Sequence, residues 1–271
     1  MALRNSPITT DIQDQLPIWP DHLRCLPNAL ARSALFNVAN QRGEREFFKK
    51  RRIAALQGIE ISYTGEELRQ DDEDVFLQIL HQARVVENGT IVRFTGYKML
   101  TELHWDKGGR GYKRLVDSID RLKASAISIT VEAPDLRQNY TGSLIRSFRW
   151  KEADSESPLR EWEVLLEKEI TSLFSPNAYT RLDWNTRLRL APMAKWLHSF
   201  YHTHRTPYPF KVETLKELMG SRVKELRQFR YMLRSALKDL VDCGFLQTAK
   251  VDARLDLVVI ERPNPHFQKL Q

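Results

Sequence analysis

Two short windows of the chain concentrate side chains that bind polyanions. Residues 107–123 carry six basic side chains against two acidic ones, and residues 222–238 carry six against one. The windows hold nine net positive charges of a chain whose total is +7, so the other residues sum to −2. A charge excess confined to two segments is typical of a surface that binds nucleic-acid phosphates.

The second window has the apolar spacing of an amphipathic helix. Its apolar residues recur every three or four positions: Leu226, Phe229, Leu233, Leu237 and Leu240. Gly244 follows where such a helix should end. The side chains expected to contact DNA lie opposite the stripe or just before it: Arg222, Lys224, Arg227, Gln228, Tyr231 and Arg234. Arg and Lys can bind phosphates or guanine and Gln can pair with adenine, so this helix is predicted to read duplex DNA.

The first window places three glycines among basic residues ahead of a similar stripe of Leu115, Ile119 and Leu122. The glycines are expected to let the backbone approach phosphates. The predicted DNA-binding residues are Lys107, Arg110, Lys113 and Arg114 in the window, with Arg146 and Arg149 on the hairpin that follows. Asp117 and Asp120 reduce the charge of this helix, so the second helix is the stronger candidate.

Both windows belong to a longer pattern that occurs twice. Residues 94–133 match residues 210–251, with Phe94 opposite Phe210 and Leu115 opposite Leu233. Each copy predicts a short helix, a turn, a longer helix and two strands, which is the winged-helix arrangement. The strands are expected at 126–133 and 142–151 in the first copy, with a third at 161–169, and at 245–251 and 255–261 in the second. The expected fold class is therefore α+β, with two tandem winged-helix domains related by internal duplication.

The expected domain boundaries follow from this repeat. They are a mobile tail at 1–20, a first domain at 21–170, a linker at 171–184, a second domain at 185–262 and a mobile tail at 263–271. An additional helix is expected at 26–38, ahead of the first winged helix. No apolar run reaches the length of a membrane span, and residues 1–15 lack the apolar core of a signal peptide. The protein is therefore expected in the cytoplasm, with no membrane partner.

Patterns that would indicate an enzyme are weak. No Walker-type phosphate-binding loop occurs, so no ATP site is expected. The acidic run at 71–74 could hold a nuclease metal, but it suits the start of a helix, where carboxylates favour the positive end of the dipole. His198, His202 and His204 lack the glutamate and the fourth ligand of a zinc site. We therefore expect no enzymatic activity, no metal and no cofactor.

Several segments resemble the TrfA-type replication initiators of broad-host-range plasmids. They include "LPIWPDHLRCLPNALARSALF" at 16–36, "FTGYKMLTELHW" at 94–105 and "TPYPFKVETLKELMGS" at 206–221, and the resemblance extends from about Leu16 to Ile260. It implies binding to repeated sites (iterons) in double-stranded origin DNA and melting of a neighbouring AT-rich region, whose single strand is a further candidate partner. It also implies recruitment of host DnaA and the replicative helicase, copy control, and a monomer–dimer equilibrium.

A short N-terminal peptide resembles the motif by which bacterial replication proteins bind the sliding clamp. Gln15, Leu16, Ile18 and Trp19 stand where that motif places a glutamine, two aliphatic residues and an aromatic residue. The alternative is that Leu16, Ile18 and Trp19 pack this segment onto the first domain.

Three other functions compete with initiation. A winged-helix repressor of operator DNA would use the same helices without clamp or helicase contacts. A nuclease or relaxase would cleave DNA with the acidic run at 71–74. An adaptor without DNA would use its winged helices for protein contacts, and salt would not affect its affinity.

Overall fold

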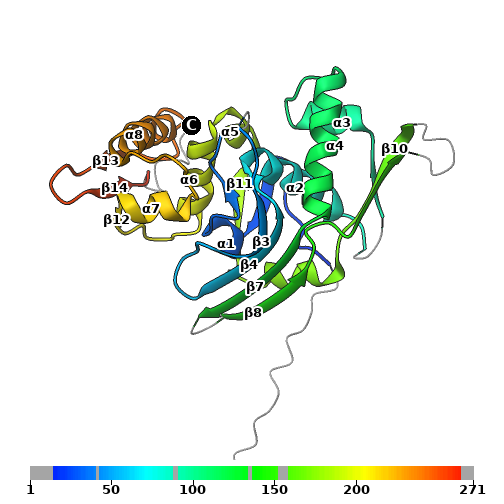
Figure 1. The fold of residues 1–271 in the computed structure, drawn as a ribbon, viewed down its shortest axis with the longest axis horizontal. Helices are drawn as coiled ribbons and strands as arrows, with labels where there is room; N and C mark the ends of the chain where they lie inside the picture. The colour runs from blue at the N-terminus through cyan, green and yellow to red at the C-terminus, as the bar shows by residue number, and fades with distance from the viewer. Residues whose placement is uncertain (1–14, 41–42, 88–90, 134–135, 152–157, 264–271) are drawn as a thin grey trace, which may run out of the picture.

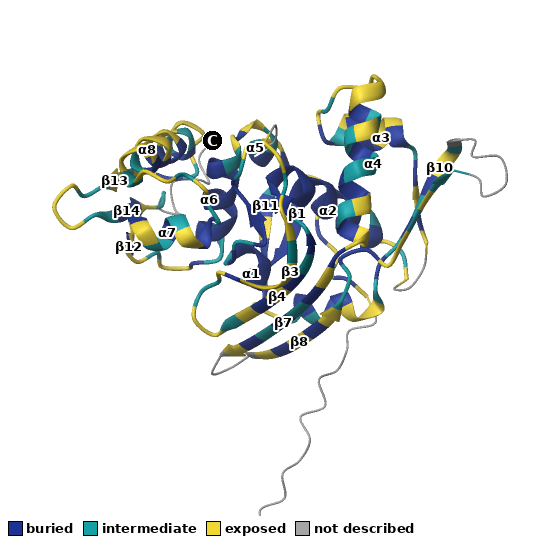
Figure 2. Cartoon of the chain, viewed as in Figure 1, coloured by how far each residue is buried: buried dark blue, intermediate teal, exposed yellow. Residues whose placement is uncertain are grey.

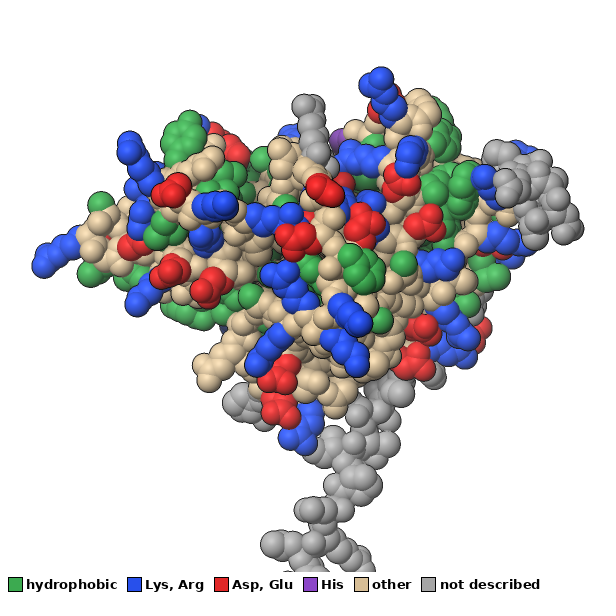
Figure 3. All heavy atoms as spheres, viewed as in Figure 1, with side chains coloured by type: hydrophobic (Ala, Val, Ile, Leu, Met, Phe, Trp, Pro, Cys, Tyr) green, Lys and Arg blue, Asp and Glu red, His purple; other side chains and the backbone are tan. Residues whose placement is uncertain are grey.

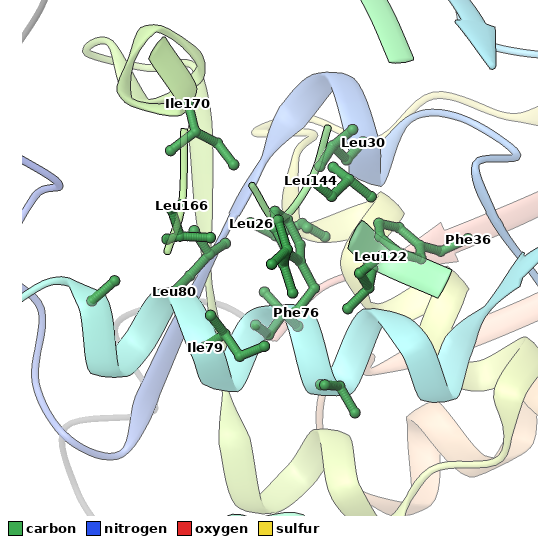
Figure 4. Packing of buried hydrophobic residues seen from close by; sticks show 14 of the residues in the cluster. Leu26, Leu30, Phe36, Phe76, Ile79, Leu80, Leu122, Leu144, Leu166 and Ile170 are labelled. Carbon is green, nitrogen blue, oxygen red and sulfur yellow. The ribbon is translucent and has the colours of Figure 1, made fainter. Parts of the chain in front are cut away.

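Helix α2 (Gln70–Ala83) lies at the centre of the computed structural model, which describes residues 15–40, 43–87, 91–133, 136–151 and 158–263 (Figure 1). Helices α4 (Gly109–Lys123) and α6 (Pro192–His202) and strand β1 (Leu23–Pro27) all contact it. Nearly every residue of α2 is therefore buried. Figure 4 shows Phe76 and Leu80 of α2 among buried apolar side chains that come from distant parts of the chain.

The buried apolar residues form two clusters, which divide the described chain into two units. The first unit covers residues 15–189 and the second covers residues 190–263, while Val38 and Leu56 of the first unit pack into the second cluster. The expected linker at 171–184 is wrong, because Leu173, Phe174 and Leu182 are buried in the first cluster. Strand β11 (Tyr179–Asp183) also pairs antiparallel with β1, which fixes this segment in the first unit.

A four-stranded antiparallel sheet forms one side of the first unit. Its order is β3 (Phe47–Ile53), β4 (Ile59–Glu66), β7 (Ala126–Ala133) and β8 (Leu136–Gly142). The strand expected at 126–133 exists as β7, but its assignment to the first wing is wrong. Ile127, Ile129 and Val131 alternate into the core while β7 pairs with β4 and β8. The alternation predicted the strand and could not identify its neighbours.

Winged-helix elements precede and follow β7 and β8 in the chain. The first winged helix consists of β6 (Val92–Phe94), α3 (Gly96–Glu102), α4, β9 (Ser147–Lys151) and β10 (Pro158–Leu165), and its sheet has the order β6-β10-β9. Thr95 caps α3, because its hydroxyl accepts a hydrogen bond from the Lys98 amide at 3.1 Å. The wing is therefore the β9–β10 hairpin, and the third strand expected at 161–169 overlaps β10 only as far as Leu165, since a 3₁₀-helix begins at Lys168.

The second winged helix has the same order of elements without an insertion. It consists of β12 (Phe210–Lys211), α7 (Val212–Leu218), α8 (Leu226–Asp242), β13 (Thr248–Val251) and β14 (Leu257–Glu261), and its sheet has the order β12-β14-β13. Gly244 follows α8 with a φ of 76°, the conformation expected of a residue that ends a helix.

Short elements complete the first unit. They are α1 (Asn28–Ala31), β2 (Phe36–Asn37), β5 (Leu68–Arg69), the 3₁₀-helix η1 (Lys168–Phe174) and α5 (Trp184–Arg189). The helix expected at 26–38 is confined to α1, because Phe36 and Asn37 leave it to pair with β5. Among the described residues, no helix is long and apolar enough to cross a membrane.

Buried charges join the two units. Arg187 of α5 is fully buried; its Nε donates to Asp74 at 2.7 Å and its Nη2 donates to Glu73 at 2.8 Å. Its Nη1 donates to the Ser199 hydroxyl of α6 at 2.7 Å, and Lys195 of α6 also pairs with Asp74. Since α6 packs against α8, this network ties the second unit to α2.

The N-terminal segment from Leu16 to Trp19 packs on the first unit. Leu16 and Trp19 are 3% and 2% exposed, whereas Ile18 between them is 76% exposed. The Trp19 indole donates to His81 Nδ1 at 3.0 Å and stacks on Phe174. Leu16 and Trp19 therefore pack on the first unit, as in the alternative to clamp binding, and Ile18 does not. The expectation of a mobile tail at 1–20 is wrong from Leu16 onward, because this segment is packed. Residues 1–14 lie outside the described part of the chain.

Trp19→Ala is expected to lower the free energy of unfolding by about 3–5 kcal/mol, because it removes a buried aromatic ring. Ile18→Ala is the matched control and should change it by less than about 0.5 kcal/mol, since that side chain faces solvent. Urea unfolding of both variants checks this, and equal small effects would contradict the packed placement of Trp19.

Stability should fall as the solution is acidified below pH 6.5. Burial, with nearby Arg24 and Arg84, lowers the pKa of His81 to about 3 from its ordinary value of 6.5. Between these values the unfolded chain binds a proton that the folded protein rejects, so stability is complete above pH 6.5 and decreases below it. The free energy of unfolding of the parent should decrease between pH 7.5 and pH 5.5. In His81→Gln, urea unfolding should show a decrease that is smaller by about 1 kcal/mol. The exposed His22→Gln control should leave the decrease unchanged.

Candidate nucleic-acid interface

Helix α8 presents its predicted DNA-contacting side chains to solvent. Phe229, Leu233 and Leu237 are buried on its inner side, which Figure 2 shows facing the rest of the second unit. The exposed side chains on or just before the helix are Lys224, Arg227, Gln228, Tyr231, Arg234 and Lys238. Arg227 and Gln228 form no hydrogen bond or ion pair with the described residues. Their polar groups are therefore free to bind a base edge or a phosphate.

The second wing is fixed against α8 by an ion pair. Arg230 Nε and Nη2 donate to the two oxygens of Asp256 at 2.8 and 2.9 Å, which also holds the pKa of Asp256 below its ordinary value. Exposed Lys250 and Arg254 extend the basic surface into this hairpin. Sequence reasoning missed both residues, although a wing placed at 245–261 contains them.

Helix α4 also carries basic side chains, but two of them pair with acidic residues. Lys113 pairs with Asp117 at 2.7 Å, and the guanidinium of Arg114 lies over the Trp105 ring at 3.7 Å while contacting Asp71 at 3.4 Å. Arg110 is exposed at the start of the helix. Arg114 and Lys113 of α4 are therefore both held by acidic partners, whereas Arg227 and Gln228 of α8 are not.

A hollow on α4 brings predicted and unpredicted basic residues together. It has a volume of about 290 Å³ and is lined by Arg45, Asp71, Arg110, Lys113, Arg114, Asp117 and Arg121. Arg45 comes from the segment before β3, so its place could not be inferred from the spacing of α4. Arg45, Lys113, Arg114 and Arg121 pair with Asp71, Asp72 or Asp117, so Arg110 is the basic side chain of this hollow that has no partner among the described residues and can bind a DNA phosphate.

Gly111, in the first turn of α4, has a packing role. A Cβ at Gly111 would lie 1.7 Å from the Asp106 carbonyl oxygen, so only glycine fits in this first turn. The Asp106 carboxylate in turn accepts a hydrogen bond from the Gly108 amide at 3.0 Å. Lys107 lies over the Tyr97 ring at 4.6 Å, which directs its ammonium group toward α3. Gly111 thus allows the backbone at Asp106 to approach the first turn of α4 closely.

The first wing contributes two arginines, as predicted. Arg149 of β9 pairs with Glu163 of β10 at 2.8 Å, and Arg93 of β6 binds the same carboxylate at 3.0 Å. Arg146 lies 4.0 Å from Glu167. Arg146 and Arg149 are more than half exposed, so both can also reach solvent. Figure 3 shows Lys and Arg side chains over both α4 and α8 on the viewed face, with acidic side chains among them.

The structure gives Arg222 a partner within the protein. Its Nη2 lies 2.6 Å from Glu67 and 3.4 Å from Glu46, and both carboxylates belong to the first unit. Arg222 therefore lies at the contact between the units, a partner that the sequence did not indicate, and its side chain is 40% exposed.

The protein-family model for TrfA protein matches residues 9–262 of this chain. The chain belongs to the TrfA family. A curated relative, the plasmid replication initiator protein TrfA of Escherichia coli, is 32% identical over 246 residues. The alignment covers 90% of this chain and 63% of the relative, so the chain spans under two thirds of that protein's length.

The fold of this TrfA-family chain is similar to that of domains 2 and 3 of RctB in solved structures. One crystal structure superposes with a TM-score of 0.56 at 14% identity, covering 87% of this chain and 96% of RctB domains 2–3. A second gives 0.54 at 12% identity, covering 82% and 92%. At these identities the likeness concerns the fold alone.

The acidic run at 71–74 begins α2, as predicted. Asp72 accepts a hydrogen bond from the Arg69 amide at 2.9 Å and from the Ser118 hydroxyl at 2.7 Å, and it pairs with Arg45 and Arg121. These carboxylates are thus occupied by cations and donors of the TrfA-family chain. In the described residues, no group of three His, Cys, Asp or Glu side chains could hold a metal ion.

The three histidines near the end of α6 pack as the sequence indicated. His198 and His202 both contact the Phe245 ring at 4.6 Å between ring centres, and His204 Nδ1 lies 2.9 Å from the Phe200 carbonyl oxygen. Burial lowers the pKa of His198 well below its ordinary value, which keeps its ring neutral.

Arg227→Ala and Gln228→Ala should each cost about 1–3 kcal/mol of binding to a specific duplex, if that side chain contacts a base. Fluorescence anisotropy on the specific duplex and on a shuffled one measures this. The control is Arg137→Ala, which removes an exposed arginine of β8 that lies 3.8 Å from Glu132, and it should leave both affinities unchanged. Equal losses on both duplexes would show a phosphate contact and contradict base reading.

Proposed function

We propose that this chain is a plasmid replication initiator that binds repeated sites in double-stranded origin DNA through α4 and α8. The observation that carries the proposal is the pair of exposed basic helices, each beside its own wing, on units that buried ion pairs hold together. Two recognition helices fixed on one chain can bind successive major-groove faces about one helical turn apart. Membership of the TrfA family supports replication initiation as the purpose of that binding.

We infer that the two winged helices arose by duplication. The order β6, α3, α4, β9, β10 in the first unit corresponds to β12, α7, α8, β13, β14 in the second, and both sheets place the last strand in the middle. The matched apolar residues of the sequence, such as Leu115 and Leu233, occupy equivalent buried places in α4 and α8. Insertion of β7 and β8 accounts for the different lengths of the two copies.

The later steps of initiation belong to the same proposal. Several protomers on adjacent repeats would bend the origin and concentrate the deformation energy in an AT-rich segment, which melts. Host DnaA and the replicative helicase would then act on the opened DNA, in the bacterial cytoplasm. A monomer–dimer equilibrium would limit how many protomers are active. None of these steps requires covalent chemistry by this chain.

Clamp binding by Gln15, Leu16, Ile18 and Trp19 would require the N-terminal segment to leave the first unit. Leu16 and Trp19 are buried, and the hydrogen bond from Trp19 to His81 would have to break. Undocking exposes a large aromatic surface, so a clamp would have to supply the equivalent contacts. The proposal therefore includes clamp binding only for a state in which this segment has left the first unit.

The chain should bind a duplex of tandem origin repeats much more tightly than a shuffled duplex. Affinity should fall by about 10³-fold or more between 50 and 200 mM salt, as expected for about 6–10 phosphate contacts. Anisotropy titrations across a salt series measure both quantities. Equal, weak binding to the two duplexes would contradict the proposal.

Strand opening separates an initiator from an operator-binding repressor. Permanganate should oxidise thymines in the AT-rich segment of a supercoiled origin plasmid only when the protein is bound at the repeats. Repeat binding without thymine reactivity would favour the repressor.

A further inference from the structure

The turn between α7 and α8 rests directly on the first unit. Gly220 in this turn has a φ of 60°, and a Cβ there would lie 2.9 Å from the Asn37 Cβ and 3.2 Å from the Ala34 Cβ. The Val38 amide donates to the Met219 carbonyl oxygen at 3.1 Å. The end of α7 and the first residues of the turn that leads to α8 therefore pack closely on residues 34–38.

A buried carboxylate receives the side chain that follows this turn. Glu67 is fully buried, and Arg222 Nη2 lies 2.6 Å from its Oε1. Asn37 Nδ2 donates to the same oxygen at 2.7 Å, and Arg69 Nη2 donates to Oε2 at 2.6 Å. Both oxygens of Glu67 thus have hydrogen-bond donors from the first unit, and Oε1 also has an ion-pair partner, Arg222, from the second unit.

The same network continues to the first recognition helix. Arg45 Nη1 donates to the Glu67 carbonyl oxygen at 2.6 Å and to Asp72 Oδ2 at 2.6 Å. Asp72 Oδ1 accepts hydrogen bonds from Ser118 at 2.7 Å and from Arg121 Nη2 at 2.8 Å, and both residues belong to α4. An unbroken series of contacts therefore joins the α7–α8 turn to α4.

We propose that Arg222 and Glu67 are positioning residues that set the separation of α4 and α8, and with it the spacing of the two DNA segments the protein accepts. This inference rests on the proposed function, since it requires both helices to bind one duplex. A buried, fully paired carboxylate tolerates little displacement, because a moved partner leaves charge unsatisfied. When Arg222 no longer contacts Glu67, α8 keeps its DNA-binding side chains, but its position relative to α4 is less constrained.

Arg222→Ala is the first test. Arg222 is 40% exposed and Glu67 keeps Asn37 and Arg69, so this variant should fold with a thermal midpoint close to that of the parent. Hydroxyl-radical footprinting of the parent complex first defines the two protected segments. Binding is then compared on that duplex and on duplexes with one or two base pairs inserted between the segments.

The parent should lose about tenfold or more in affinity with each insertion, comparable to a mismatched base pair. Arg222→Ala should bind the natural spacing more weakly and lose most of this discrimination. Arg222→Lys should keep most of it, because a single nitrogen, Nη2, makes both carboxylate contacts. Arg52→Ala is the matched control, since this exposed arginine of β3 pairs with Glu60 within the first unit and should not change the spacing preference.

The two proposals fail in different ways. If the full-length parent shows no preference for origin repeats, the proposed function fails and the spacing inference fails with it. If the parent rejects inserted base pairs and Arg222→Ala rejects them equally, only the positioning role is overturned. A uniform affinity loss on all spacings would identify Arg222 as a phosphate contact, which also overturns that role. Should the variant melt early, Glu67→Gln provides a neutral side chain of the same shape for the same comparison.

Discussion

Four consecutive carboxylates, from Asp71 to Asp74, lie buried at the start of α2. Burial of so much negative charge is tolerated only where cations and hydrogen-bond donors meet each group. The cations come from many places in the chain: the segment before β3, helix α4, helix α5 and helix α6. Because α2 can be buried only when these elements surround it, its charges determine where α4 lies and where the second unit attaches.

The helices of both winged helices could be predicted from the sequence, since each one depends on local information. The stripe of α8 and the position of Gly244 describe one helix and its end, and both are observed. The face opposite the stripe is exposed for the same reason, so Arg227 and Gln228 could be assigned to it. The Trp19 segment posed a choice that no local pattern decides, because an aliphatic–aromatic peptide suits a foreign cleft and its own core equally well.

The errors concern pairing between distant segments. Strand β7 has the alternation of any half-buried strand, and its partner β4 lies more than sixty residues earlier in the chain. Residues 171–184 mix polar and apolar positions, as a linker does. They nevertheless include β11, which pairs with β1 in a two-stranded antiparallel sheet. Arg222 looked like its basic neighbours, and only the folded chain brings it to Glu67. Each mistake arose where tertiary contacts, rather than local periodicity, decide the outcome.

The segments that follow the two basic helices differ in the sheets that they join. Helix α4 ends at Lys123 and β7 begins at Ala126, so a rotation of α4 must strain the four-stranded sheet to which it is joined. Helix α8 ends beside Gly244, which has open space around it, and continues into a short three-stranded sheet. Helix α4 is therefore constrained from its C-terminal end by the sheet that follows it, whereas α8 is constrained from its N-terminal side by the contact of Arg222 with Glu67.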